Sequence, residues 1–118
     1  MDLNQAIAAH AQWKQRFRSA IADGSVLPAA EIRKDDQCEL GCWLYGAGGH
    51  QYGHLPQFVD LLERHRVFHQ EAARIAEHIN AGSHADAMLM LDGPTAYGQA
   101  TVAIGAVVHA LRQTIGTT

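Results

Sequence analysis

The sequence predicts an all-α protein, a four-helix bundle with an additional short helix that carries a cysteine. Three observations favour this fold. Apolar residues recur at three- and four-residue intervals over several long segments, which is the pattern of an amphipathic helix. Strand-like alternation, internal repeats and low-complexity segments are missing from the sequence. The chain is 118 residues long, and because domains of ~100–150 residues are the commonest, we expect residues 1–118 to form a single domain.

The first helix is predicted to run from Leu3 to the pair Asp23-Gly24, which ends it. Residues at helical spacing form its buried face, with Trp13 beside them: Leu3, Ile7, His10, Phe17 and Ile21. Pro28 then opens a polar connector, residues 29–37, which has no clear periodicity. We expect this connector to be the least ordered part of the chain.

A short helix is predicted over the compact apolar segment Cys38–Tyr45. Residues 46–49 are Gly-Ala-Gly-Gly, and we expect this glycine-rich stretch to end the helix and to continue as a loop. His50 and His54 are expected to lie in that loop.

The strongest helix signal follows Pro56, a residue suited to a first helical turn, and ends at Asn80-Ala81-Gly82. One stripe continues for about six turns. It consists of Phe58, Leu61, Leu62, His65, His69, Ala72, Ile75, Ala76 and Ile79.

Two further helices are predicted after this one. Ser83 and Asp86 resemble a capping box that starts a short helix, which Gly93-Pro94 interrupts. The last helix runs from about Pro94 to Ile115 and is apolar on most of its circumference. A helix of this kind needs burial on more than one side, so it lies deep in the bundle or contributes to a subunit contact.

Composition and charge exclude several classes of protein. The chain has 9 Lys plus Arg against 12 Asp plus Glu, a net charge of −3, so it lacks the basic excess that nucleic-acid binding requires. The first residues lack the charge and apolar run of a signal peptide, and the longest apolar stretch is too short for a membrane span. Two cysteines four positions apart favour a reducing compartment. We therefore expect a soluble, cytoplasmic protein.

Three of the eight histidines are predicted to face inward. His10 takes an apolar position in the first helix, and His65 and His69 lie one turn apart on the same face, the spacing at which two imidazoles reach one metal ion. A lone inward histidine is more often a hydrogen-bonded core residue. For the pair, either a shared metal ion or a network of carboxylates could satisfy the two buried imidazoles. A cysteine on a short apolar element favours the metal ion.

Three histidines and one cysteine would make a tetrahedral set that suits Zn²⁺ and disfavours Mg²⁺ or Ca²⁺. Four protein ligands leave no position for a catalytic water, so the set argues against hydrolysis. A di-iron site is disfavoured too, because no Glu-x-x-His pair occurs in the sequence. We expect no enzymatic activity.

The sequence resembles the bacterial chemoreceptor zinc-binding (CZB) domain. The matching elements, in order, are His10-Ala-Gln-Trp13, the box Cys38-Glu-Leu-Gly-Cys-Trp-Leu-Tyr45, and His65-Arg-Val-Phe-His69. The resemblance implies zinc ligands His10, Cys38, His65 and His69, and it selects Cys38 over Cys42, which falls on a variable position of the pattern. It also implies a homodimer.

Domains of this kind are similar to sensory inputs that regulate chemoreceptors or diguanylate cyclases, so the resemblance implies a zinc-sensing domain that controls a signalling output in cis or in trans. Two alternatives use the same site: a redox sensor of the hypochlorous-acid type acting through the Cys38 thiolate, and a purely structural zinc ion. A third is a metal buffer that uses outer histidines, namely His50, His54, His78 and His84. These four histidines are expected to be exposed and have no common spacing that would gather them around one ion, so this third reading is weak.

Overall fold

A computed structural model describes residues 2–92 and 94–115 of the chain, and all regular elements among them are helices. The prediction of an all-α protein is confirmed. These described residues form eight successive helices: α1 (Leu3–Ala11), α2 (Trp13–Asp23), α3 (Ala29–Arg33), α4 (Glu39–Tyr45), α5 (Ala47–Tyr52), α6 (Pro56–Asn80), α7 (His84–Leu91) and α8 (Ala96–Ile115). The described part is elongated, with extents of 44 × 25 × 19 Å.

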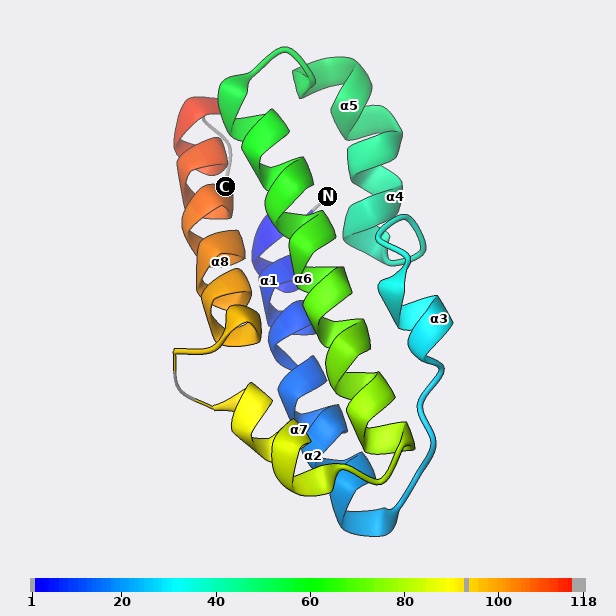
Figure 1. The fold of residues 1–118 in the computed structure, drawn as a ribbon. Coiled ribbons are helices and arrows are strands. Elements are labelled where there is room, and N and C mark those ends of the chain that lie inside the picture. Colours follow the sequence, from blue (N-terminus) through cyan, green and yellow to red (C-terminus); the bar gives the residue numbers. More distant parts are fainter. Residues whose placement is uncertain (1, 93, 116–118) are drawn as a thin grey trace.

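Helix α6 is the central element of the fold (Figure 1). It packs against α8 over its N-terminal and middle parts, against α2 and α3, and against α7 near its C-terminal end. The predicted stripe is its buried face, because apolar residues spaced at three and four positions fall on one side of a helix. Among its fully or almost fully buried members are Phe58, Leu61, Ala72, Ile75 and Ile79.

The predicted first helix has a discontinuity at Gln12, which separates α1 from α2. Gln12 keeps right-handed helical angles, φ −68° and ψ −19°, so the two helices follow nearly one axis (Figure 1). The end at Gly24 is as predicted, and this glycine has a φ of +73°, a left-handed conformation that residues with a Cβ rarely adopt.

The prediction of an irregular connector is wrong for residues 29–33, which form α3. This short helix contains one large apolar residue, Ile32, and buries it against α6, so that only 4% of Ile32 is exposed. Because only one of the five residues of α3 is buried, the sequence of this helix shows no apolar periodicity. The contact that stabilises α3 is tertiary, and it could not be read from local sequence.

The predicted glycine-rich loop after Tyr45 is also wrong. Helix α4 ends there, but α5 begins at Ala47 and contains His50. Gly48 allows this arrangement, because a Cβ at this position would lie 2.6 Å from the indole of Trp43. The glycine is therefore needed for the close packing of α5 on α4, and it does not mark a loop.

The C-terminal helices differ from the prediction in their start signals. Helix α7 begins after Ser83 as expected, but the side chain of Ser83 makes no capping hydrogen bond, so the predicted capping box does not form. Helix α8 begins at Ala96 rather than Pro94, and the hydroxyl of Thr95 accepts a hydrogen bond from Gly98 N–H at its start. The predicted interruption at Gly93 lies outside the described residues. In the part of the chain that the structure describes, no helix is both long and apolar enough to span a bilayer.

Candidate metal centre

His10 lies in the last turn of α1 and points into the molecule, with 5% of its surface exposed. Its spacing from Leu3 and Ala6 places all three on the buried face of α1. The Nδ1 atom of His10 lies 2.7 Å from the carbonyl oxygen of Ala6. A carbonyl can only accept, so Nδ1 carries the proton, and in the neutral ring Nε2 presents a lone pair to the interior.

His65 and His69 lie one turn apart on α6, and both are buried. The Nδ1 atom of His69 lies 2.7 Å from the carbonyl oxygen of Ile32 in α3, so its Nε2 also presents a lone pair. This hydrogen bond connects His69, a candidate ligand, to α3, the short helix that was not predicted from the sequence. Predictions that His10, His65 and His69 face inward are confirmed by their burial.

Cys38 is the residue immediately before α4 and is half-buried. Its extended backbone, φ −81° and ψ 165°, directs the side chain back over the first turn of that helix, where Gly41 N–H lies 3.3 Å from Sγ and donates to it. A backbone N–H aimed at sulfur favours the thiolate form, which is the form that binds metals.

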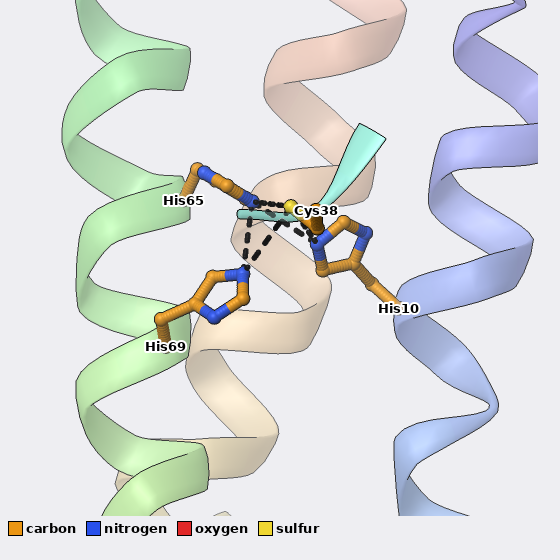
Figure 2. A group of neighbouring side chains, drawn as sticks. All are labelled: His10, Cys38, His65 and His69. Carbon is orange, nitrogen blue, oxygen red and sulfur yellow. Dashed lines mark hydrogen bonds between the residues drawn. The ribbon is translucent and has the colours of Figure 1, made fainter. Parts of the chain in front are cut away.

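The four donor atoms converge on one point (Figure 2). The Nε2 atom of His65 lies 3.0 Å from that of His10 and 3.1 Å from that of His69. The sulfur of Cys38 lies 3.3 Å from the Nε2 of His65, 3.7 Å from that of His69 and 3.8 Å from that of His10. All four atoms lie within 4.8 Å of one another.

Hydrogen bonds within the cluster leave part of it unsatisfied. The lone pairs on the Nε2 atoms of His10 and His69 both face the Nε2 of His65, whose single proton serves one of them, and the Cys38 thiol can serve the other only over a longer distance of 3.7–3.8 Å. With its proton on Nε2, His65 keeps a buried Nδ1 that has no hydrogen-bond partner among the described residues. A cation at the centre would satisfy all four donor atoms at once.

The spacing of the donors fits a tetrahedral zinc ion. Zinc–nitrogen bonds of about 2.0–2.1 Å and zinc–sulfur bonds of about 2.3 Å give tetrahedral edges of roughly 3.3 Å between nitrogens and roughly 3.6 Å between nitrogen and sulfur. Five of the six separations are 3.0–3.8 Å and lie on either side of these values, and the sixth, between the Nε2 atoms of His10 and His69, is within 4.8 Å. Three imidazoles and a thiolate are also the ligand types that zinc prefers.

Burial controls the protonation of the cluster. Desolvation lowers the pKa of His10, His65 and His69, so the imidazoles are neutral at pH 7 and able to bind a metal. Desolvation also raises the pKa of the Cys38 thiol, so the metal-free cysteine is protonated at neutral pH. Metal binding would therefore displace a proton from sulfur.

The structure brings together all four residues that the sequence singled out. Cys42 lies outside the cluster: it is exposed, and its thiol donates to the carbonyl oxygen of Asp36. The remaining histidines are half-buried or exposed and belong to no such group in the described residues: His50, His54, His78, His84 and His109.

Sequence reasoning missed the groups that orient the cluster. The carbonyls of Ala6 and Ile32 orient two imidazoles, and no sequence signal could have identified them, because every residue has a carbonyl. The N–H of Gly41 was indicated only indirectly, by the glycine of the cysteine box. The Nδ1 atom of His65 is buried and has no hydrogen-bond partner among the described residues.

Comparison with known families agrees with this site. The family model of the chemoreceptor zinc-binding domain, CZB, matches residues 10–76, which is more than half of the 118 residues. The chain belongs to this family. The match begins at His10 and includes all four clustered residues, whereas α7 and α8 lie beyond it. No curated protein and no solved structure matches the chain at a significant level.

CZB domains occur in signalling proteins, where they are sensory or regulatory rather than catalytic by themselves. The chain thus combines membership of a zinc-binding family with a His3Cys cluster that fits a zinc site.

Proposed function

We propose that this protein is a zinc-sensing regulatory domain whose zinc ligands are His10, Cys38, His65 and His69. The observation that carries the proposal is the convergence of four donor atoms, three imidazole nitrogens and one sulfur, within 4.8 Å of one another. Zinc supplies a closed tetrahedral centre when bound and no open position for chemistry. The three histidines supply neutral, buried imidazoles, two of which are oriented by backbone carbonyls.

The regulatory part of the proposal is supported by the origins of the ligands. His10 comes from α1, the pair His65 and His69 from α6, and Cys38 from the segment between α3 and α4. Helix α6 and the row formed by α1 and α2 are held together by the core, whereas Cys38 lies between the short helices α3 and α4. Metal occupancy would therefore act most strongly on the α3–α5 segment, which is a two-state element of the kind a switch requires.

Several broader features belong to the same proposal. We place residues 1–118 in one domain that acts in the cytoplasm as a homodimer and regulates a chemoreceptor or a diguanylate cyclase, in cis or in trans. The architecture that we propose is a four-helix bundle in which three rows are α1–α2, α6 and α8, and the short helices α3–α5 complete the fourth. Family membership supports the signalling role, and the order of helices around α6 supports the bundle (Figure 1).

Metal analysis of purified variants tests the ligand set. We expect one zinc per chain in the wild type and loss of zinc in Cys38→Ser and His65→Ala, read together with the oligomeric state. His50→Ala and Cys42→Ser are matched controls, because each changes an exposed residue of the same type outside the cluster, and both should keep one zinc. Full zinc occupancy in Cys38→Ser would overturn the ligand assignment, and several zinc ions per chain would favour a metal buffer.

Chelation separates sensing from a purely structural role. For a sensor, removal of zinc should leave most of the helical circular dichroism signal in place and change only part of the molecule. Global unfolding upon chelation would instead support a structural ion.

A redox sensor remains the second candidate, and one observation favours it. Cys38 is the least buried of the four proposed ligands. An oxidant of the hypochlorous-acid type would therefore reach its sulfur first, and oxidation of the sulfur would remove a ligand. Treatment with mild oxidant followed by mass spectrometry and zinc measurement tests this. Retained zinc and an unmodified Cys38 would exclude it.

A further inference from the structure

The segment Lys34–Gln37, which we call the strap, joins α3 to Cys38 and has no helical hydrogen-bond pattern. Both of its ends are connected to the cluster of His10, Cys38, His65 and His69. On one side the carbonyl of Ile32 accepts the hydrogen bond from His69, and on the other side Cys38 is itself a member of the cluster. The position of the strap therefore determines where the thiol lies.

Three contacts from α4 hold the strap. The hydroxyl of Tyr45 donates to Asp35 Oδ2 over 2.6 Å, and the thiol of Cys42 donates to the Asp36 carbonyl over 3.5 Å. Gly41 completes the contact, because its Cα faces the Asp35 carbonyl so closely that a Cβ would lie 1.9 Å from that oxygen. The Tyr45–Asp35 hydrogen bond is the shortest of these polar contacts, and it is the one with a charged acceptor.

The strap also lies on the accessible side of the cluster. His10, His65 and His69 are 5%, 0% and 4% exposed, and their helices form the packed interior. Cys38 is half-buried. A metal ion leaving the cluster would have to pass the side where Cys38 and the strap lie, since the other ligands are surrounded by core residues.

Tyr45 is well placed to act as a latch rather than as a core residue. Its side chain is 53% exposed, so it contributes little to the apolar core. The hydrogen bond to Asp35 raises the pKa of Tyr45 to about 12, which keeps the phenol protonated and donating at any physiological pH. Removing the hydroxyl would therefore loosen the strap without creating a cavity in the core.

We propose that Tyr45 and Asp35 form a latch that positions Cys38 and sets the rate at which zinc leaves the cluster. The proposal rests on the proposed zinc site. Both residues act through Cys38 and are positioning residues, because neither belongs to the ligand set. Opening of the latch frees the strap, and the freed strap allows the thiolate to move away from the three histidines.

Stopped-flow transfer of zinc to a chromophoric chelator tests the latch, with wild type, Tyr45→Phe, Asp35→Asn and the double variant. We expect each single variant to release zinc roughly tenfold faster, the fold-change that corresponds to loss of one hydrogen bond to a charged group. The double variant should be no faster than the singles, because both break the same bond. Tyr45→Phe is the more informative change, since it retains the Asp35 charge near the cluster.

Controls make the result specific. Asp60→Asn removes an exposed carboxylate that bonds Arg64 on α6, and it should leave the release rate unchanged. Asp35→Glu, which retains a carboxylate, should release zinc more slowly than Asp35→Asn. All variants should hold one zinc per chain before the transfer begins.

The outcomes distinguish this proposal from the zinc site on which it rests. A wild-type release rate in Tyr45→Phe, with one zinc bound, would overturn the latch and leave the zinc site intact. Absence of zinc from the wild-type protein would overturn both. Additive acceleration in the double variant would show that the two residues act separately, which also overturns the latch.

Discussion

Gly41 illustrates how a single residue shapes the candidate metal centre. A Cβ at this position would lie 1.9 Å from the Asp35 carbonyl oxygen and 2.8 Å from its carbon, and backbone atoms cannot move away as a flexible side chain can. The N–H of the same residue donates to the sulfur of Cys38. Gly41 therefore combines close approach of the strap with stabilisation of the thiolate.

We expect Gly41→Ala to destabilise the protein by about 1–3 kcal/mol, the usual effect of overpacking, and to weaken zinc binding because the strap must shift. Urea unfolding and competitive zinc titration measure the two effects. Gly105→Ala is the matched control, because a Cβ there meets nothing within 4 Å and alanine is the better helix former. Equal zinc affinity in both variants would contradict the role of close packing at Gly41.

The buried histidines predict a pH dependence for the metal-free protein. Burial lowers the pKa of His10, His65 and His69 in the folded state, whereas the unfolded chain protonates them as the pH falls below about 6.5. The unfolded state then binds more protons, so the free energy of unfolding decreases as the pH falls. Three histidines set an upper limit of about 4 kcal/mol per pH unit on this slope.

Urea unfolding with a chelator present, from about pH 7.5 down to about pH 5, checks this slope around the imidazole range. Replacing His65 by Leu should reduce the slope, by about 1.4 kcal/mol per pH unit at most, since one protonation site is removed. A free energy of unfolding that is constant over this range would show that the histidines are not buried in the neutral form.

At the scale of elements, the long helix α6 fixes the position of segments that have little structure of their own. Its last residue, Asn80, accepts a hydrogen bond from Leu27 N–H and donates one to the Leu27 carbonyl, both over 2.8 Å. This pair of bonds holds the connector that leads into α3. The position of α3, and through it the carbonyl that orients His69, depends on α6 at two places.

We expect Asn80→Ala to lower the free energy of unfolding by about 1–2 kcal/mol, because two hydrogen bonds are lost from a partly solvated site. Urea unfolding of the zinc-loaded protein gives the value. Gln70→Ala changes an exposed residue of the same helix and should have an effect within about 0.5 kcal/mol. Equal stability of the two variants would show that the Leu27 contact is not formed in solution.

At the scale of the whole molecule, one small centre joins three segments that are far apart in sequence. A ligand that binds only the folded state raises the free energy of unfolding by RT ln(1 + [L]/Kd), about 2.7 kcal/mol when free zinc is 100 times Kd. Thermal unfolding with zinc and with chelator should therefore give different midpoints in the wild type. Cys38→Ser should show a much smaller difference, and an equal shift in both would mean that zinc acts elsewhere.

The outer face of α8 is the whole-molecule feature that bears on the proposed homodimer. The sequence of α8 is apolar on more than one side, and Val102 on this helix is 73% exposed. If this face forms the subunit contact, Val102→Lys should shift the protein towards monomer in analytical ultracentrifugation. Val26→Lys is the control, because Val26 is 80% exposed but lies in the connector after α2. A dimer that is unaffected by Val102→Lys would place the contact on another face.

The sequence by itself determined the features that depend on local periodicity. The long helix α6 and the inward direction of His10, His65 and His69 follow from spacing, since a helix places residues three and four positions apart on one face. Helices that lack such a stripe were missed. In α3 only Ile32 is buried, and in α5 the glycine-rich sequence indicates a loop, whereas Gly48 permits close packing on Trp43.

Only the tertiary structure decided how the site is assembled. Periodicity shows that a histidine faces the interior, but it gives no distance between residues on different helices. Convergence of Cys38 with three imidazoles depends on the packing of α1 against its neighbours and on the strap held by Tyr45 and Asp35. The orientation of His69 depends on a backbone carbonyl of α3. Side-chain identity does not encode such contacts, because they arise from the backbone and form only when distant segments meet.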